Sequence, residues 1–330
     1  MRFGLFGGPS RGAHPDDAAA YAAYLDAVVE AEALGFTGVY LVEHHFTGRG
    51  QPSASLALLA HLAARTRTMR LGTAVVVVPW HHPLLLAEQA ATVDVLSGGR
   101  FDLGVGRGYR DYEFRGFGID AAEAAERFDE AMAVLRLAWT AGGRFSHHGR
   151  HWRFEDVLVE PAPVQRPHPP LWMGAASHRS IERAAREGYR LFLDQVGTFE
   201  QTAARGAAYR AAKQAAGFAS SQDDVAVTRG LRIATSRAER DALVERQLAT
   251  LTFLADASAP PRPDGPTNPF YSPPQTRRET VEAGAIIGTP DECIERLGRL
   301  RAGGIERVLF SGATLEELRL FAREVMPAFG

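Results

Sequence analysis

Short apolar, β-branched segments alternate with helical patterns along almost the whole chain, and this alternation constrains the fold more than any other feature. The predicted strands are residues 2–6, 38–42, 71–78, 101–105, 171–174, 189–193, 225–234 and 305–310. The predicted helices are residues 15–34, 53–65, 84–96, 121–140, 180–187, 199–217, 237–254 and 315–325. A further helix is predicted to start at Thr289 and Pro290, with the threonine as its cap and the proline in its first turn. Polar residues are absent from the run Ala74 to Val78, as expected for a parallel strand that is buried on both faces.

Eight strand-then-helix units in one chain favour a (β/α)8 TIM barrel over an open doubly wound sheet. Two segments interrupt the alternation. Residues 142–169 form an excursion after the fourth helix and are predicted to be irregular. Residues 257–275 follow the seventh helix and contain seven prolines, and so long a loop in a compact domain is usually functional. The other connections are too short for a second domain, so we expect one domain over residues 1–330.

Composition narrows the class of protein. The net charge is −2, which argues against a basic surface and therefore against nucleic acid as a partner. Cys293 is the only cysteine, so the chain has no internal disulfide and no thiolate metal cluster. The apolar segment at the N-terminus is too short for a signal peptide, and no segment approaches the length of a membrane span. We therefore expect a cytoplasmic protein that does not bind membranes.

The residues that follow the second predicted strand are Glu43, His44 and His45. In a barrel of this kind the site is built at the C-terminal ends of the strands, and imidazole groups beside a carboxylate titrate near neutral pH. The simpler explanation is a pair of surface histidines. Adjacent histidines, as at positions 44–45, 81–82 and 147–148, do not chelate one ion comfortably, and no helical H-x-x-x-H pair occurs. We therefore expect no metal site.

Two later loops could hold a phosphate. Gly106-Arg107-Gly108 follows the fourth strand, where glycines allow close approach and arginine offers a planar fork of donors. The segment 174–180 opens a helix that contains Ser177 and Ser180, and helix starts bind anions. A turn with a solvated arginine and an ordinary serine cap are the simpler explanations. The loops do not match a Walker loop or a dinucleotide-binding fingerprint, and no serine-hydrolase elbow is present.

These motifs resemble those of the bacterial luciferase-like monooxygenases, in particular the luciferase α subunit and its non-luminous relatives. The shared motifs are Met1-Arg2-Phe3-Gly4, Leu41-Val42-Glu43-His44-His45-Phe46-Thr47, Leu71-Gly72-Thr73-Ala74, Gly98-Gly99-Arg100-Phe101, Gly104 with Arg107-Gly108, and Gly288-Thr289-Pro290-Asp291-Glu292-Cys293. They keep the family order over nearly the whole chain, so the resemblance is specific.

The resemblance implies a two-component monooxygenase. Such an enzyme uses reduced FMN from a separate flavin reductase, together with molecular oxygen, to oxygenate a small organic substrate through a C4a-peroxyflavin. His44 is then the catalytic base and His45 a second catalytic residue. The implied cofactor-binding residues are Ala74, Val75, Gly106, Arg107, Tyr109, Arg127, Ala176, Ser177 and Ser180. The implied substrate pocket contains Phe6, Glu43, Trp80, His82 and Glu113.

The resemblance also implies a cis peptide between Ala74 and Val75 and a mobile lid near residues 256–286. Departures from the family pattern are Gly106, where luciferases have a reactive cysteine, and Ala176, where they have a carboxylate. Flavin monooxygenation therefore carries over better than light emission or an aldehyde substrate. A non-catalytic flavin-binding partner subunit and a deazaflavin-dependent dehydrogenase remain alternatives. Apolar helices at 53–64 and 84–96 predict a homodimer or a heterodimer with a related subunit.

Overall fold

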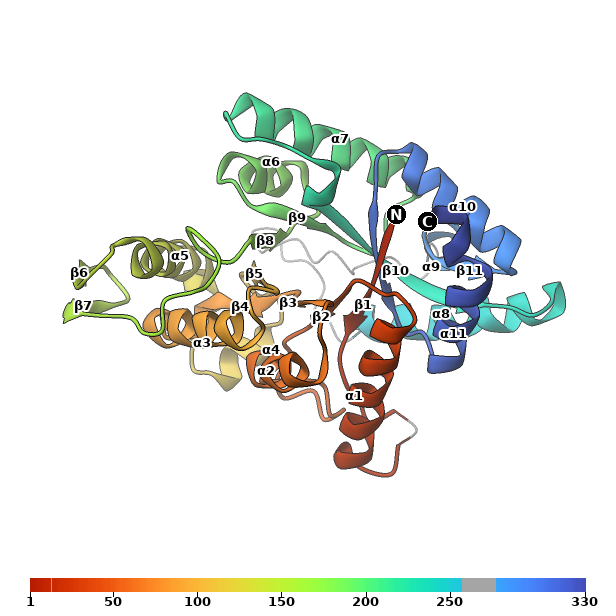
Figure 1. Cartoon of the computed structure of the whole chain (residues 1–330), viewed down its shortest axis with the longest axis horizontal. Coiled ribbons are helices and arrows are strands. Elements are labelled where there is room, and N and C mark those ends of the chain that lie inside the picture. Colours follow the sequence, from red (N-terminus) through yellow and green to blue (C-terminus); the bar gives the residue numbers. More distant parts are fainter. Residues whose placement is uncertain (13, 257–276) are drawn as a thin grey trace. The chain divides into compact units, whose positions relative to one another are not determined.

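The computed structural model describes residues 1–12, 14–256 and 277–330, and these residues contain the closed barrel that the sequence predicts (Figure 1). Its eight parallel strands follow the order β12, β1, β2, β3, β5, β8, β9 and β10, and β10 pairs with β12. The barrel strands are β1 (Arg2–Gly7), β2 (Gly38–Leu41), β3 (Arg70–Thr73), β5 (Phe101–Gly106), β8 (Leu171–Gly174), β9 (Arg190–Leu193), β10 (Val225–Ile233) and β12 (Arg307–Ser311). The predicted fold class is confirmed.

Apart from two short helices that were not predicted, the helices of the described chain lie close to the predicted ranges. They are α1 (Asp17–Ala33), α2 (Ser55–Arg65), α3 (Pro83–Leu96), α4 (Asp111–Gly116), α5 (Ala124–Thr140), α6 (His178–Arg186), α7 (Phe199–Ala215), α8 (Arg237–Asp256), α9 (Arg277–Gly284), α10 (Pro290–Ala302) and α11 (Leu315–Glu324). Capping boxes at Thr198, Thr289 and Thr314 begin α7, α10 and α11. Each threonine hydroxyl accepts a hydrogen bond from the backbone N–H three residues later, so the sequence itself sets where these helices start.

The described chain divides into two compact units, residues 1–7, 27–39 and 173–330 in the first, and residues 8–26 and 40–172 in the second. The expectation of a single domain over residues 1–330 stays a prediction. In the first unit, Phe3, Phe310 and Phe321 form an aromatic core with ring centroids 4.8–5.8 Å apart. In the second unit, Phe101 and Leu103 of β5 are fully buried, as expected for a strand covered on both faces.

The prediction of one continuous strand at residues 71–78 is wrong. After β3, the peptide between Ala74 and Val75 is cis, as the resemblance implied, and a short strand β4 (Val76–Val77) follows. Gly72 lies opposite Asp102 of β5, whereas Val76 lies opposite Val105, so the broken strand holds one more residue than its partner. Such a bulge turns side chains without changing the apolar composition, and a hydrophobic run therefore does not reveal it.

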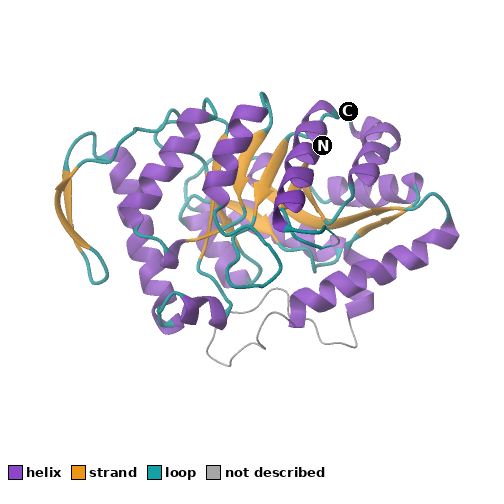
Figure 2. Cartoon of the chain, turned by 90° about the horizontal axis from the view of Figure 1, so that it is seen from below, coloured by secondary structure: helices purple, strands orange, loops and turns teal. Residues whose placement is uncertain are grey.

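The prediction of irregular structure at residues 142–169 is wrong for residues 145–157, whereas residues 158–169 are irregular, as expected. Strands β6 (Phe145–His148) and β7 (Arg153–Val157) form the antiparallel hairpin at the left of Figure 2. Its turn is held by Glu130 of α5, whose carboxylate accepts hydrogen bonds from the backbone N–H groups of His151 and Trp152 at 2.9 and 3.0 Å. Most hairpin side chains are exposed or half-buried, so the sequence lacks the apolar alternation by which strands are predicted.

The predicted loop at residues 257–275, and most of the expected lid, lie outside the described residues. Residues after this gap form α9 and the short strand β11 (Ile286–Gly288), which pairs with the end of β10. Neither element was predicted, because eight and three residues are too few for a clear period.

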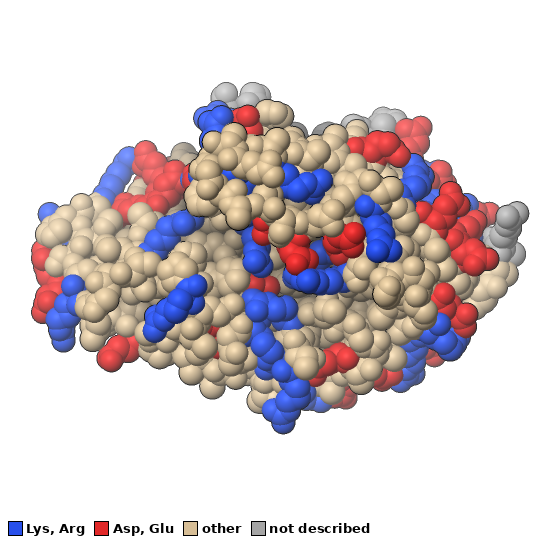
Figure 3. Space-filling model, turned by 45° about the horizontal axis from the view of Figure 1, so that its top comes forward, with Lys and Arg blue, Asp and Glu red and all other residues tan. Residues whose placement is uncertain are grey.

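None of the helices within the described residues is both long and apolar enough to cross a bilayer. On the face shown in Figure 3, acidic and basic residues are interspersed.

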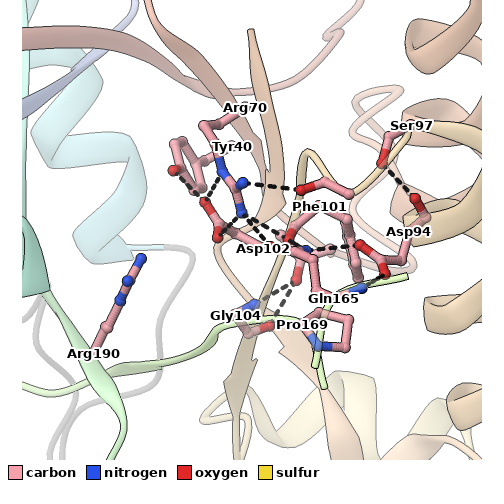
Figure 4. Close-up of polar contacts among 12 residues, drawn as sticks. Tyr40, Arg70, Asp94, Ser97, Phe101, Asp102, Gly104, Gln165, Pro169 and Arg190 are labelled. Carbon is pink, nitrogen blue, oxygen red and sulfur yellow. Dashed lines mark hydrogen bonds and ion pairs between the residues drawn. The ribbon is translucent and has the colours of Figure 1, made fainter. Parts of the chain in front are cut away.

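A buried polar network joins the beginnings of β3 and β5 in the second unit (Figure 4). The carboxylate of Asp102 accepts hydrogen bonds from the hydroxyl of Tyr40 at 2.8 Å and from the guanidinium of Arg70 at 2.5 and 3.1 Å. A Cβ atom at Gly72 would approach the Tyr40 ring to 2.4 Å. A glycine at this position of β3 therefore leaves space for the ring. Because Asp102 is fully buried, loss of a partner leaves a polar group without solvent to replace it.

We expect Tyr40→Phe to lower the free energy of unfolding in urea by about 2 kcal/mol, since it removes one hydrogen bond to a buried charge. The control is Arg65→Ala, which removes a partly exposed ion pair with Asp26 and is expected to cost less than about 1 kcal/mol. A loss for Tyr40→Phe no larger than that of the control would contradict a stabilising role for this network.

Candidate active site

Glu43, His44 and His45 lie just beyond the end of β2, after Val42, as predicted, and belong to the second unit. The backbone N–H of His44 donates to the carbonyl of Pro52 at 3.0 Å, which anchors the loop. Phe46 has a positive φ of 58°, an uncommon backbone conformation that ends the extended segment. The three predicted residues are therefore held on a turn at the C-terminal end of a barrel strand.

The carboxylate of Glu43 is the first of two buried anions in this region. Its Oε1 lies 3.0 Å from Nε2 of His45 and 2.8 Å from Nε2 of His81, and its Oε2 accepts from the backbone N–H of Val77 at 2.7 Å. Burial opposes the charged form of Glu43, but these hydrogen bonds outweigh burial and hold its pKa below the ordinary value. An ionised carboxylate only accepts hydrogen bonds, so both imidazole rings present a protonated Nε2 to it.

The second buried anion is Glu113 on α4. Its Oε1 lies 3.3 Å from Nδ1 of His44 and accepts from the backbone N–H of His45 at 2.9 Å. Nη1 of Arg110 lies 3.7 Å from the same oxygen. The contact with Glu113 favours the tautomer of His44 that carries its proton on Nδ1, which leaves Nε2 as the basic nitrogen.

The His44 side chain is only 15% exposed, and its surroundings favour the neutral ring. Burial lowers the pKa of His44, the hydrogen bond with Glu113 opposes this effect, and the charge of Arg110 adds to it, so that the pKa lies below its ordinary value. A neutral imidazole at neutral pH can accept a proton, which is the property that a general base requires.

Aromatic rings surround His45 in the second unit. Its ring lies 4.7 Å from that of Phe117 and 5.4 Å from that of Trp80, and Trp80 stacks on Phe117 at 5.3 Å. Phe46 is 61% and Phe117 38% exposed. An exposed cluster of aromatic side chains beside titratable groups is typical of a binding surface for an organic ligand.

The predicted residues around Gly106 lie at the C-terminal end of β5. A Cβ atom at Gly106 would approach Cγ2 of Val75 to 2.4 Å, so the position has no space for the cysteine of the luciferases while Val75 stays in place. Arg107 is exposed and Tyr109 is half-buried. The predicted ligand Arg127 is engaged with Glu123 at 2.9 Å and lies 5.9 Å from the centre of the Trp152 ring; its cofactor role stays a prediction.

Ala176, Ser177 and Ser180 belong to the first unit. The Ser177 hydroxyl accepts the backbone N–H of Ser180 at 3.2 Å and thereby caps α6. A hollow of about 1150 Å³ opens beside this turn, and Ala176, Ser177 and His178 contribute to its lining. The remaining predicted pocket residue of this unit, Phe6 on β1, is half-buried.

Two residues at the site were missed by sequence reasoning, Arg110 and His81. Arg110 follows the predicted Tyr109 directly, and α4, which it precedes, was not predicted. The sequence does not indicate which of the adjacent histidines 81 and 82 faces the site. In the structure His81 contacts Glu43, whereas His82 is exposed at the start of α3. The pocket role of His82 stays a prediction.

Within the described ranges, no group of three or more His, Cys, Asp and Glu side chains could hold a metal.

Comparison with curated proteins gives relatives of known activity. The chain is 29% identical over 329 residues to the oxygenase component of a flavin-dependent trigonelline monooxygenase from Acinetobacter baylyi, covering 89% of this chain and 86% of the relative. It is also 29% identical over 301 residues to an FMNH2-dependent dimethylsulfone monooxygenase from Pseudomonas putida, covering 85% and 79%. Two uncharacterized proteins of Sinorhizobium fredii are 36% and 40% identical, and the chain spans only 52% and 49% of their lengths.

Solved structures extend the comparison. The monooxygenase RslO1 from Streptomyces bottropensis superimposes with a TM-score of 0.85 at 30% identity, with all of both chains covered. An F420-dependent secondary alcohol dehydrogenase has a TM-score of 0.79 at 17% identity over 100% of this chain and 99% of its own, and this likeness concerns the fold alone. Residues 1–307 match the sequence profile of the luciferase-like monooxygenases. The chain belongs to the luciferase-like monooxygenase family.

Proposed function

We propose that this protein is the oxygenase of a two-component flavin-dependent monooxygenase, which uses reduced FMN and molecular oxygen to oxygenate a small organic substrate. The observation that carries the proposal is His44, a nearly buried imidazole whose Nδ1 faces Glu113 and whose Nε2 is left to accept a proton. Family membership and the flavin-dependent relatives support the same reaction class. A separate reductase supplies the reduced flavin.

The residues that would hold the flavin are those implied by the resemblance. The Ala74–Val75 peptide, whose valine side chain lies against Gly106, and Gly106 itself would contact the ring. The capped start of α6, with Ser177 and Ser180, is suited to a phosphate. Arg107, Tyr109, Arg127 and Ala176 complete the proposed cofactor set. Reduced FMN, when bound, supplies the electrons with which molecular oxygen reacts.

The protein then has two tasks, to manage a proton and to keep water away. His44 takes or holds the proton at Nε2, while Glu113 keeps the ring in one orientation. His45, fixed by Glu43, presents its ring to the aromatic cluster of Trp80 and Phe117. These aromatic rings, with Phe6, Glu43, His82 and Glu113, form the proposed substrate pocket.

We also propose that the barrel works as one domain and pairs with a second copy or a related subunit. The supporting observation is that Leu85, Val95 and Leu96 of α3 are exposed by 53%, 42% and 57%. Apolar side chains exposed in this way on one helix are suited to a partner helix.

The first experiment is a stopped-flow measurement. Protein mixed anaerobically with reduced FMN is expected to bind it and, on mixing with oxygenated buffer, to delay flavin reoxidation relative to free reduced FMN, because a closed site excludes water and side reactions. Serum albumin at the same concentration is the control. Reoxidation at the free rate would contradict the oxygenase, and tight binding of a reduced deazaflavin alone would favour the dehydrogenase.

Replacement of His44 by Ala tests the proposed base. We expect FMN binding to be retained and substrate oxygenation to fall by about 10²–10⁴-fold, the usual contribution of general base catalysis. The matched control is His61→Ala, at an exposed histidine of α2, which is expected to match the wild type in both measurements. Full activity of the His44 variant would remove this residue from the mechanism.

The pH dependence offers an independent check. A base must be unprotonated to act, so kcat/KM should fall as the pH drops through the pKa of His44. Because burial holds this pKa below its ordinary value, the fall is expected below about pH 6.5, the ordinary histidine value. Circular dichroism at each pH separates this loss from unfolding, and an acid limb that lies above the ordinary value would contradict the assignment.

A further inference from the structure

A fully buried guanidinium lies beside the proposed base. Arg110 is 1% exposed and stands at the N-terminal boundary of α4. Its Nη1 donates to the hydroxyl of Tyr112 at 2.9 Å and lies 3.7 Å from Oε1 of Glu113, and its Cζ lies 5.5 Å from the centre of the Tyr109 ring. Among the described residues, its Nε has no hydrogen-bond partner. Burying a charge with incomplete pairing is costly, so the position calls for an explanation.

In the part of the chain that the structure describes, three charged groups act on His44. Glu113 contacts its Nδ1, Glu43 acts on it through space, and Arg110 is the only one of the three with a positive charge. Both carboxylates favour a protonated His44, whereas Arg110 opposes protonation. Glu43 has hydrogen-bond partners of its own in His45, His81 and the Val77 N–H. The charge of Glu43 is the same in every variant considered below, so the comparison concerns Arg110, Glu113 and His44.

The charge of Arg110 decides which protonation state of His44 leaves this group of three residues without net charge. With Arg110 positive and Glu113 negative, the group is neutral when His44 is neutral and carries a charge of +1 when His44 is protonated. Without Arg110, the group would be neutral only when His44 is protonated, because Glu113 is negative and protonated His44 is positive. A poorly solvated site favours the arrangement without net charge, so removing Arg110 should drive a proton onto His44.

We propose that Arg110 is a positioning residue that compensates Glu113, so that Glu113 orients His44 without protonating it. The inference rests on the proposed role of His44 as a base. Arg110 acts through Glu113 and is too deeply buried to contact substrate in this structure. Tyr112 and Tyr109 keep its guanidinium in place. The imidazole of His44 is thereby both oriented and neutral. In a simple histidine–carboxylate pair, the carboxylate that orients the ring also favours its protonation.

The test measures the protonation of His44 directly, in the flavin-free protein, by NMR titration of ¹³C-labelled imidazole rings. His44→Gln identifies the signal. In Arg110→Met we expect the pKa of His44 to rise by about one unit, as is usual for loss of a nearby compensating charge. In Glu113→Gln we expect a fall, because the anion that favours protonation is gone. Arg110→Lys keeps the charge and should return His44 toward the wild-type value.

Shifts in opposite directions are the signature of the proposal, because loss of packing alone gives no reason for a change of sign. The matched control is Arg65→Met, which removes a positive charge from α2 and should leave His44 unshifted. An unchanged pKa in Arg110→Met, or a shift in the same direction in Glu113→Gln, would overturn the inference. If Arg110→Met does not fold, judged by its urea midpoint, Arg110→Gln replaces it, because this variant also removes the charge but keeps a hydrogen-bond donor for Tyr112.

The titration separates this inference from the proposed function. Opposite shifts in a protein that binds no reduced FMN would uphold the Arg110–Glu113–His44 arrangement while removing the oxygenase proposal. In an active enzyme, the acid limb of kcat/KM should move to higher pH in Arg110→Met, following the NMR value. An active enzyme whose acid limb ignores the NMR shift would contradict the link between Arg110 and the base.

Discussion

The candidate active site depends on two buried carboxylates, Glu43 and Glu113, and on the hydrogen bonds that each of them accepts. A carboxylate taken out of water needs hydrogen bonds or a counter-charge, and each of the two has partners in an element far away in the sequence. Glu43 binds His45, His81 and the N–H of Val77. Glu113 binds His44 and the N–H of His45. The loop after β2, the segment around β4 and the helix α4 are thus held in one arrangement by the need to satisfy these two charges.

A second set of buried charges lies at the opposite ends of the strands. Asp102, the second residue of β5, binds Tyr40 and Arg70, whereas Gly106, the last residue of the same strand, lies against Val75. In barrels of this class the N-terminal ends of the strands serve stability and the C-terminal ends serve chemistry. Strand β5 follows this division, since one end holds a closed polar network and the other pairs with Val77, whose N–H binds Glu43.

The order of strands and helices could be predicted because it follows from local periodicity and caps. Thr289 and Pro290 began α10 as expected, and the family motifs indicated the cis peptide between Ala74 and Val75. The bulge after Thr73 could not be predicted, because it changes register and leaves composition unchanged. The hairpin of β6 and β7 was missed for a related reason, since its side chains are mostly exposed and few apolar residues mark its strands.

The sequence by itself determined the barrel and placed Glu43, His44 and His45 at the end of a strand, because a repeated strand–helix pattern has few ways to bury its apolar faces. Only the tertiary structure decided which histidine meets which carboxylate. Nothing in the sequence distinguishes His81 from His82, and nothing brings Arg110 and Glu113 to His44, 66 and 69 positions earlier in the chain. Contacts of this range depend on how α4 packs beside the loop after β2, and that packing is a property of the folded chain.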